Sequence, residues 1–100
     1  MDRPDLPLNA LRVFEVAMRQ GSFTKAAIEL RVTQAAVSHQ VARLEDLLGT
    51  ALFLRPSQGL IPTDEGRLLF PVLEHGFDAM SRVLDRLGGR RDIEVLKVGV

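Results

Sequence analysis

The residues with the most chemistry to offer lie together on one predicted helix, which runs from Gln34 to Leu48. By helical spacing, five side chains fall on or beside its exposed face: Gln34, Ala35, Ser38, His39 and Arg43. The acids Glu45 and Asp46 come only after this face has turned toward the helix end. A face with an arginine, hydrogen-bonding groups and no acid suits a helix that lies in the major groove of duplex DNA.

The segment that presents this helix, residues 22–49, has the pattern of a helix-turn-helix. Small and branched apolar residues recur in it at intervals of five: Ala27, Val32 and Val37. Thr33 is a good N-cap for the second helix. Glycine is common at such a corner, where a positive φ is often needed, but Arg31 occupies the position, so we expect a wider or a strained corner. The alternative is an ordinary packed helical hairpin.

Composition argues against catalysis. The chain has 100 residues, no cysteine and only two histidines, and it lacks a glycine-rich phosphate loop. These residues do not assemble a nucleophile with its base, a metal cluster or a cofactor cradle, so we predict no enzyme, no metal and no cofactor. The aromatics are five phenylalanines, most of them on helical core stripes. They provide no stacking platform for the alternative of an RNA or single-strand binder.

The balance of thirteen basic and thirteen acidic residues argues against nucleic-acid binding. The distribution of these charges along the chain partly answers this objection. Between Glu29 and Glu45 the charged residues are Arg31 and Arg43, and His39 can add a positive charge. Because phosphate affinity then rests on few cations per subunit, we expect two subunits to bind together.

Nothing in the sequence marks the chain for export or for a membrane. Its first residues include acids and lack the apolar core of a signal peptide, and no apolar run approaches the length of a membrane span. We therefore expect a cytoplasmic protein with no membrane partner.

A first helix should pack over the helix-turn-helix. Pro7-Leu8-Asn9 opens it, with Asn9 as its N-cap, and Gly21 closes it. Its apolar side is expected to cover the next two helices. On the helix from Gln34 to Leu48, the residues expected to point inward are Val37, Val41, Leu44 and Leu48.

A small hairpin, or wing, is predicted after Gly49. Two short apolar runs, 52–54 and 60–61, flank a segment with turn composition. The wing either brings its tip to the DNA backbone or minor groove, or only covers the core. The wing residues that would contact DNA are Arg55, Ser57 and Gln58.

The last helix is predicted from the N-cap Thr63 to the Gly88–Gly89 pair. Pro71 should remove one backbone hydrogen bond and bend the helix, or split it. Apolar residues recur at alternating steps of three and four, the pattern of a coiled-coil seam: Phe70, Leu73, Phe77, Met80, Leu84 and Leu87. We expect this seam to form the interface with a second copy. The alternatives are a helix folded back over its own domain and a helical adaptor module without DNA binding.

Beyond the glycines, branched residues alternate with charged ones and predict a β-strand. Because a lone strand has nothing to pair with, we expect residues 90–100 to be the hinge and first strand of a missing domain. The predicted fold is all-α with a small β-hairpin. It comprises a winged helix-turn-helix (1–62), a linker or dimerisation helix (63–89) and this terminal segment.

Several motifs occur together: LxxLxxF at 8–14, SFTxAA at 22–27, VTQxAVSxQV at 32–41, LFxR at 52–55 and TxxG at 63–66. In these the chain resembles the LysR-type transcriptional regulators over nearly its whole length. The resemblance implies an N-terminal winged helix-turn-helix, a linker helix that dimerises and a C-terminal effector-binding domain of periplasmic-binding-protein type. Residues 7–11 and 33–41 look most like the branch with regulators of β-lactamase expression and of glycine cleavage.

Carried over by position, the family's base-contacting residues match Gln34, Ala35, Ser38 and His39. Gln34 can bond an adenine edge bidentately, Ala35 can touch a thymine methyl, and the other two can donate or accept. The chain departs from many members, which have proline at position 35 and arginine at position 39. The residues expected at the DNA backbone or in the wing contact are Thr24, Lys25, Thr33, Arg43, Arg55, Ser57 and Gln58.

The expected mode of binding follows from these parts. Two subunits joined by the linker helix would place their recognition helices in successive major grooves, about 34 Å apart, on an interrupted palindrome. At full length we expect a tetramer, with a small-molecule effector bound only by the missing C-terminal domain.

Overall fold

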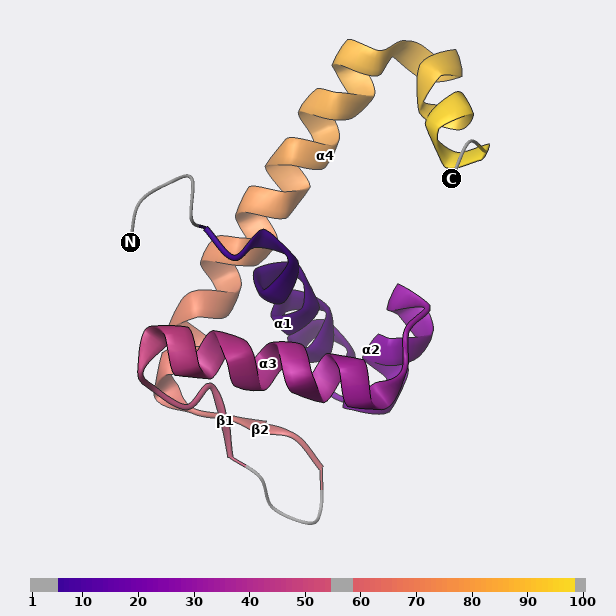
Figure 1. Ribbon diagram of the computed structural model, residues 1–100. Coiled ribbons are helices and arrows are strands. Elements are labelled where there is room, and N and C mark those ends of the chain that lie inside the picture. Colours follow the sequence, from indigo (N-terminus) through magenta and orange to yellow (C-terminus); the bar gives the residue numbers. More distant parts are fainter. Residues whose placement is uncertain (1–5, 55–58, 99–100) are drawn as a thin grey trace.

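The computed structural model describes residues 6–54 and 59–98. Within these ranges the chain forms four helices and one two-stranded antiparallel sheet, so the predicted fold is confirmed. In chain order, the elements are α1 (Leu8–Gln20), α2 (Phe23–Leu30), α3 (Gln34–Leu48), β1 (Phe53–Leu54), β2 (Ile61–Pro62) and α4 (Asp64–Val98) (Figure 1).

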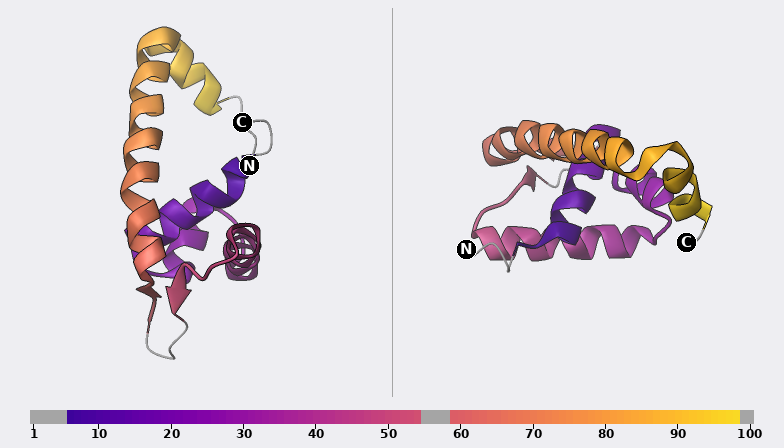
Figure 2. Two further views of the ribbon diagram at one scale, coloured as in Figure 1. Left: turned by 90° about the vertical axis from the view of Figure 1, so that its left-hand side faces the viewer. Right: turned by 90° about the horizontal axis from the view of Figure 1, so that it is seen from above.

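Helix α1 is the centre of the molecule, with α3 on one side of it and α4 on the other (Figure 2). It ends at Gly21, whose φ of 67° is left-handed. The predicted N-cap is wrong, because Pro7 takes the cap position and Asn9 lies inside the first turn. The carbonyl of Pro7 accepts from the amide of Leu11 at 2.9 Å, and the helix starts two residues earlier than the predicted cap implies.

The corner between α2 and α3 is strained rather than wide. Arg31 has φ 60° and ψ 44°, a left-handed conformation that costs a non-glycine residue about 1–2 kcal/mol. The amide of Val32 donates to the carbonyl of Ala27 at 3.0 Å and closes the end of α2. Thr33 then caps α3 as predicted, because its hydroxyl accepts from the amide of Ala36 at 3.0 Å.

One apolar core joins the three N-terminal helices to the wing. The inward residues of α3 are buried as predicted for Val37, Val41 and Leu44. Leu48 is exposed, so its predicted inward position is wrong; Leu52 and Phe53 close this end of the core in its place. The ring of Phe53 packs against those of Phe14 and Phe23, with centroids 5.4 and 5.7 Å apart.

The predicted wing is confirmed as an antiparallel pair in which Leu54 lies opposite Ile61. Glu45 of α3 holds it in place, because its carboxylate accepts from the amides of Leu52 and Phe53 at 2.8 and 3.3 Å. The wing is therefore fixed to the C-terminal end of α3. The predicted tip contacts, Arg55, Ser57 and Gln58, lie outside the described residues.

Helix α4 starts against the wing. The Thr63 hydroxyl accepts from the amide of Gly66 at 3.1 Å, as a cap does, and donates to the carbonyl of Ala51 at 2.7 Å. Gly66 lies directly against the carbonyl oxygen of Leu52, so a side chain does not fit there. The helix is continuous through Pro71 rather than split.

The end of α4 differs from the prediction. The helix continues through Gly88 and Gly89 to Val98, so the predicted hinge and β-strand are wrong as far as that residue. A strand needs a partner for its backbone groups, whereas a helix pairs them within the segment. Figure 1 shows the axis turning sharply where the colour passes into yellow, the region of the two glycines. Such pairs favour a kink.

Candidate nucleic-acid interface

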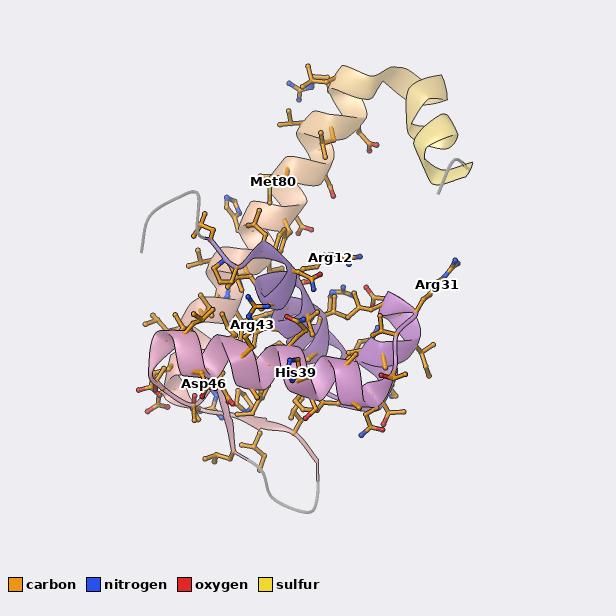
Figure 3. The ribbon with its side chains drawn as sticks, in the orientation of Figure 1. Arg12, Arg31, His39, Arg43, Asp46 and Met80 are labelled. Carbon is orange, nitrogen blue, oxygen red and sulfur yellow. The ribbon has the colours of Figure 1, made fainter. Side chains whose placement is uncertain are left out.

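Helix α3 leaves one long side open to solvent (Figure 3). The predicted residues lie on this side: Gln34, Ala35, His39 and Arg43 are exposed, and Ser38 is half-buried. Helical spacing puts Ala35 and His39 at its centre. Gln34 and Ser38 border the wing, and Arg43 lies toward the start of α1. The structure thus brings together the side chains that the sequence selected.

An acid shares this open side. Asp46 is exposed and follows His39 by seven residues, two helical turns, so both project from the same side of α3 (Figure 3). The prediction of a face without acid is therefore wrong for Asp46. Glu45 does turn away, because the wing amides hold its carboxylate. Counting in steps of four, three and four from Ala35 would have found the acid in the sequence.

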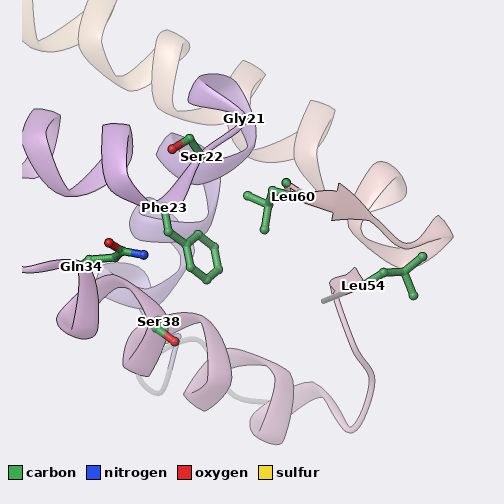
Figure 4. A pocket seen from close by; sticks show the side chains of 8 residues that line it. Gly21, Ser22, Phe23, Gln34, Ser38, Leu54 and Leu60 are labelled. Carbon is green, nitrogen blue, oxygen red and sulfur yellow. The ribbon is translucent and has the colours of Figure 1, made fainter. Parts of the chain in front are cut away.

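A cleft of about 350 Å³ lies between α3, the start of α2 and the wing (Figure 4). Its lining residues are Gly21, Ser22, Phe23, Gln34, Ser38, Leu54, Gly59 and Leu60. Gln34 and Ser38 bring their polar groups to this cleft from α3. Two of the four predicted base-contacting side chains therefore lie between the recognition helix and the wing.

The start of α2 lies beside the first residue of α3. Ser22 caps α2, because its hydroxyl accepts from the amide of Lys25 at 3.1 Å. Thr24 does not cap the helix, and its hydroxyl donates to Oε1 of Gln34 at 3.2 Å. Thr24 and Lys25 are both exposed. Two predicted backbone contacts therefore adjoin a predicted base contact.

An ion cluster ties α1 to α2 outside this face. Arg19 pairs with Glu29 at 2.7 Å and with Glu15 at 3.2 Å, and Gln20 donates to Glu29 at 2.7 Å. The hydrogen bond from Arg19 lowers the pKa of Glu29 to about 2, and the same bond raises the pKa of Arg19. Because this arginine is shared between two glutamates, the cluster supplies no free cation for DNA.

The predicted seam of α4 has two kinds of surroundings. Phe70 and Leu73 pack against the core of their own domain. For these two residues, the structure agrees with the alternative prediction of a helix that folds back over its own domain. Phe77 is half-buried, whereas Met80, Leu84 and Leu87 are exposed. We call the side of α4 that carries Gly66, Phe70, Leu73, Phe77, Met80 and Leu84 the inner face.

A second apolar stripe, which the sequence prediction missed, runs along another side of α4. We call it the outer stripe; its residues are Leu68, Val72, Gly76, Ala79, Val83 and Leu87. Its four large members are exposed, from 48% for Val83 to 77% for Leu68. Helical spacing alone could have found it, but the heptad pattern favoured the inner face with its two phenylalanines.

Two kinds of site are absent from the described residues. No group of three or more histidine, cysteine, aspartate or glutamate side chains there could hold a metal ion. No helix in the same part of the chain is long and apolar enough to cross a membrane.

Comparison with known proteins gives a consistent picture. Residues 8–67 match the bacterial regulatory helix-turn-helix proteins of the lysR family. The chain is 99% identical over its 100 residues to the HTH-type transcriptional activator AmpR of Rhodobacter capsulatus, of which it covers 35%. It is 49% identical over 98% of its length to a carbapenem-hydrolyzing beta-lactamase transcriptional activator of Enterobacter cloacae, of which it covers 33%. The chain thus spans about a third of the length of these curated relatives.

A solved structure with the same fold contains DNA. It is the BenM DNA-binding domain in complex with catB site 1 DNA, at 30% identity and a TM-score of 0.74. The match covers 80% of this chain and 89% of that one.

Proposed function

Since the chain belongs to the LysR family of bacterial helix-turn-helix regulators, we propose that it binds duplex DNA with sequence preference through the open side of α3. It is a regulator and not an enzyme. The observation that carries the proposal is a capped, exposed helix whose polar side chains stand clear of the core. The name of the Enterobacter cloacae relative supports control of β-lactamase expression as the role of the full-length protein.

In the proposed complex α3 lies in the major groove with its first two turns against the base edges. Ala35 is small enough to let the helix approach closely and can touch a thymine methyl. His39 can donate or accept one turn later, and Gln34 and Ser38 contact bases on the wing side. Asp46, farther along, repels phosphate and can accept from a cytosine amine, so it would restrict which sequences fit.

Phosphate contacts would come from both flanks of α3. Lys25 lies at the start of α2, and Thr33 and Arg43 lie on α3 and its cap. The amides at the helix N-termini add to these contacts. The wing tip would supply Arg55, Ser57 and Gln58.

One subunit offers few cations, and Asp46 offsets one of them, so we propose that two subunits bind together. The outer stripe of α4 is the surface for the second copy. Because α4 lies across α1 from α3 (Figure 2), a dimer formed there would leave both recognition helices open.

The outer stripe has the spacing that a twofold contact requires. Its steps of four, four, three, four and four residues are the same from either end. Two antiparallel copies would therefore place Leu68 opposite Leu87, and Val72 opposite Val83, in an isologous interface. Gly76 and Ala79 fall at the centre, where small residues let helix axes approach closely. Among the described residues, nothing lies within 4 Å of a side chain added at Gly76.

The full-length protein would use this dimer on an interrupted palindrome, with recognition helices about 34 Å apart. The boundary between residues 62 and 63 fits this arrangement, with α4, which runs to Val98, as the linker helix. The rest of the relatives' length leaves room for a C-terminal domain that would bind a small-molecule effector and support a tetramer. We place the protein in the cytoplasm.

Salt dependence is the direct test. Affinity for duplex DNA, measured by fluorescence anisotropy, should fall steeply as salt is added, because bound cations on the protein release counterions from the phosphates. Arg43→Gln should reduce the logarithmic slope by about one. Arg82→Gln makes the same change of charge on α4, away from the open side of α3, and should leave the slope unchanged.

A second measurement tests contact with bases. Gln34→Ala should weaken binding to a selected duplex more than binding to a random duplex, because it removes base contacts and not phosphate contacts. Equal losses on both duplexes would contradict the role of Gln34.

The exposed outer stripe also suits a helical dimerisation or adaptor module without DNA binding. That function predicts a stable dimer whose affinity for duplex DNA is negligible even at low salt. The salt experiment therefore separates the two proposals.

A further inference from the structure

One hydrogen bond joins the two helices of the helix-turn-helix at its exposed edge. The Thr24 hydroxyl and Oε1 of Gln34 are 3.2 Å apart. The hydroxyl must be the donor, because the amide oxygen carries no hydrogen. The capping roles on both helices belong to other residues, Ser22 on α2 and Thr33 on α3, so this bond is not part of a cap.

We infer that Thr24 is a positioning residue for Gln34 and makes it select adenine over guanine. The inference rests on the proposed function, in which Gln34 contacts a base edge. It gives Thr24 a role different from the phosphate contact that the family resemblance implies.

The geometry holds both partners at fixed positions. Thr24 is the second residue of α2 and Gln34 is the first residue of α3, and each helix start is fixed by its own cap. A free glutamine side chain loses rotamer freedom when it binds, at a cost in affinity. The hydroxyl of Thr24 removes part of this cost, because it orders the amide before DNA arrives.

The bond also fixes which end of the amide points where. Figure 4 shows the amide nitrogen of Gln34 pointing into the cleft and the oxygen turned away from it. The half-turn of the amide that exchanges oxygen and nitrogen would break the hydrogen bond with Thr24. The bond therefore favours one order of acceptor and donor toward a base.

This order matches adenine. The amide oxygen has two lone pairs, of which Thr24 occupies one. The other can accept from the adenine N6 amine while the amide nitrogen donates to N7. Guanine offers two acceptors at the same edge, so it needs an amide turned to present only its donors. Thr24 opposes that turn, and the bond strengthens when the interface excludes water.

The test compares two variants of the chain at the same site. Thr24→Val keeps the shape and removes the donor, whereas Thr24→Ser keeps the hydroxyl. A duplex would first be selected by the unmodified chain from a randomised DNA pool. The base pair whose preference is lost in Gln34→Ala identifies the position that Gln34 contacts. Affinities would then be measured with each base at that position, on random duplex, and alongside thermal unfolding.

We expect adenine at this position, and a fall in the adenine-to-guanine affinity ratio of roughly three- to tenfold in Thr24→Val, the effect of one hydrogen bond. Thr24→Ser should restore the ratio, and random-duplex affinity and unfolding temperature should not change. An unchanged ratio in Thr24→Val, or a selected guanine, would overturn the inference. An equal loss on all duplexes would also overturn it, because it would assign Thr24 to phosphate. Failure of the unmodified chain to bind any duplex would overturn the proposed function and this inference together.

Discussion

The two apolar sides of α4 have similar composition and different surroundings. The inner face begins on the domain core, where Phe70 and Leu73 pack and Gly66 lies against the wing backbone. The outer stripe has no such cover within the described residues, and Leu68 and Val72 are 77% and 67% exposed only a turn from packed residues. The comparison teaches that helical periodicity identifies an apolar side but not what covers it.

The difference follows from where α1 lies. Helix α4 contacts α1 with one side only and then extends away from the three N-terminal helices (Figure 1). The inner face therefore changes neighbours along its length, from core to solvent. The outer stripe keeps one environment throughout, which is the condition for a continuous contact with an identical helix.

The largest effect is expected from a charge on the outer stripe. Val83→Asp should weaken self-association more than a hundredfold, because it would bury an unpaired carboxylate in both subunits. Leu84→Asp places the same charge at the next residue, on the inner face, and should leave the dimer intact. Sedimentation velocity over a dilution series measures both. A dimer that is lost in Leu84→Asp and retained in Val83→Asp would move the interface to the seam that the heptad pattern predicts.

Substitution of one glycine on each side of α4 should change stability by a smaller amount and in opposite directions. Gly66→Ala should destabilise the fold by about 1–3 kcal/mol, because its methyl group would overlap with the carbonyl oxygen of Leu52. Gly76→Ala meets open space on the outer stripe and should stabilise the helix by about 0.5–1 kcal/mol. Denaturant unfolding in a Val83→Asp background measures these changes without a contribution from the dimer. Equal effects at the two glycines would remove the contrast between the two sides.

Local signals in the sequence predicted most of the fold. The caps at Thr33 and Thr63 and the left-handed Gly21 fix helix ends by contacts within a few residues, so they could be found without a structure. The same holds for the side of α3 that carries Gln34 and His39, since a single helical period determines it.

Interactions between distant residues account for what was missed. Leu48 faces solvent because Leu52 and Phe53, which follow α3 in the chain, are buried at this end of the core instead. The predicted seam of α4 is divided into packed and exposed residues because α4 extends beyond α1. The periodicity of α4 alone does not predict where α1 ends. Residues 90–98 alternate like a strand but form a helix, because no partner strand is present among the described residues.

The smallest effect is expected where the inner face leaves the domain. There Phe77, Met80 and Leu84 border a groove of about 410 Å³ whose other wall holds Arg19 and Glu29. This ion pair is partly exposed, so Glu29→Gln should cost only about 1 kcal/mol or less at neutral pH.

The pH dependence of that cost gives a sharper test of how open the groove is. Because the folded pKa of Glu29 is lowered from 4.5 to about 2, its contribution to stability is present above pH 4.5 and is lost as the pH falls through that range. The unfolding free energies of the unmodified chain and Glu29→Gln should therefore converge toward pH 2. Added salt should shrink the difference at neutral pH, because exposed charges are screened. A difference that resists salt would mean that this part of the inner face is covered in solution, and the contrast with the outer stripe would then extend along all of α4.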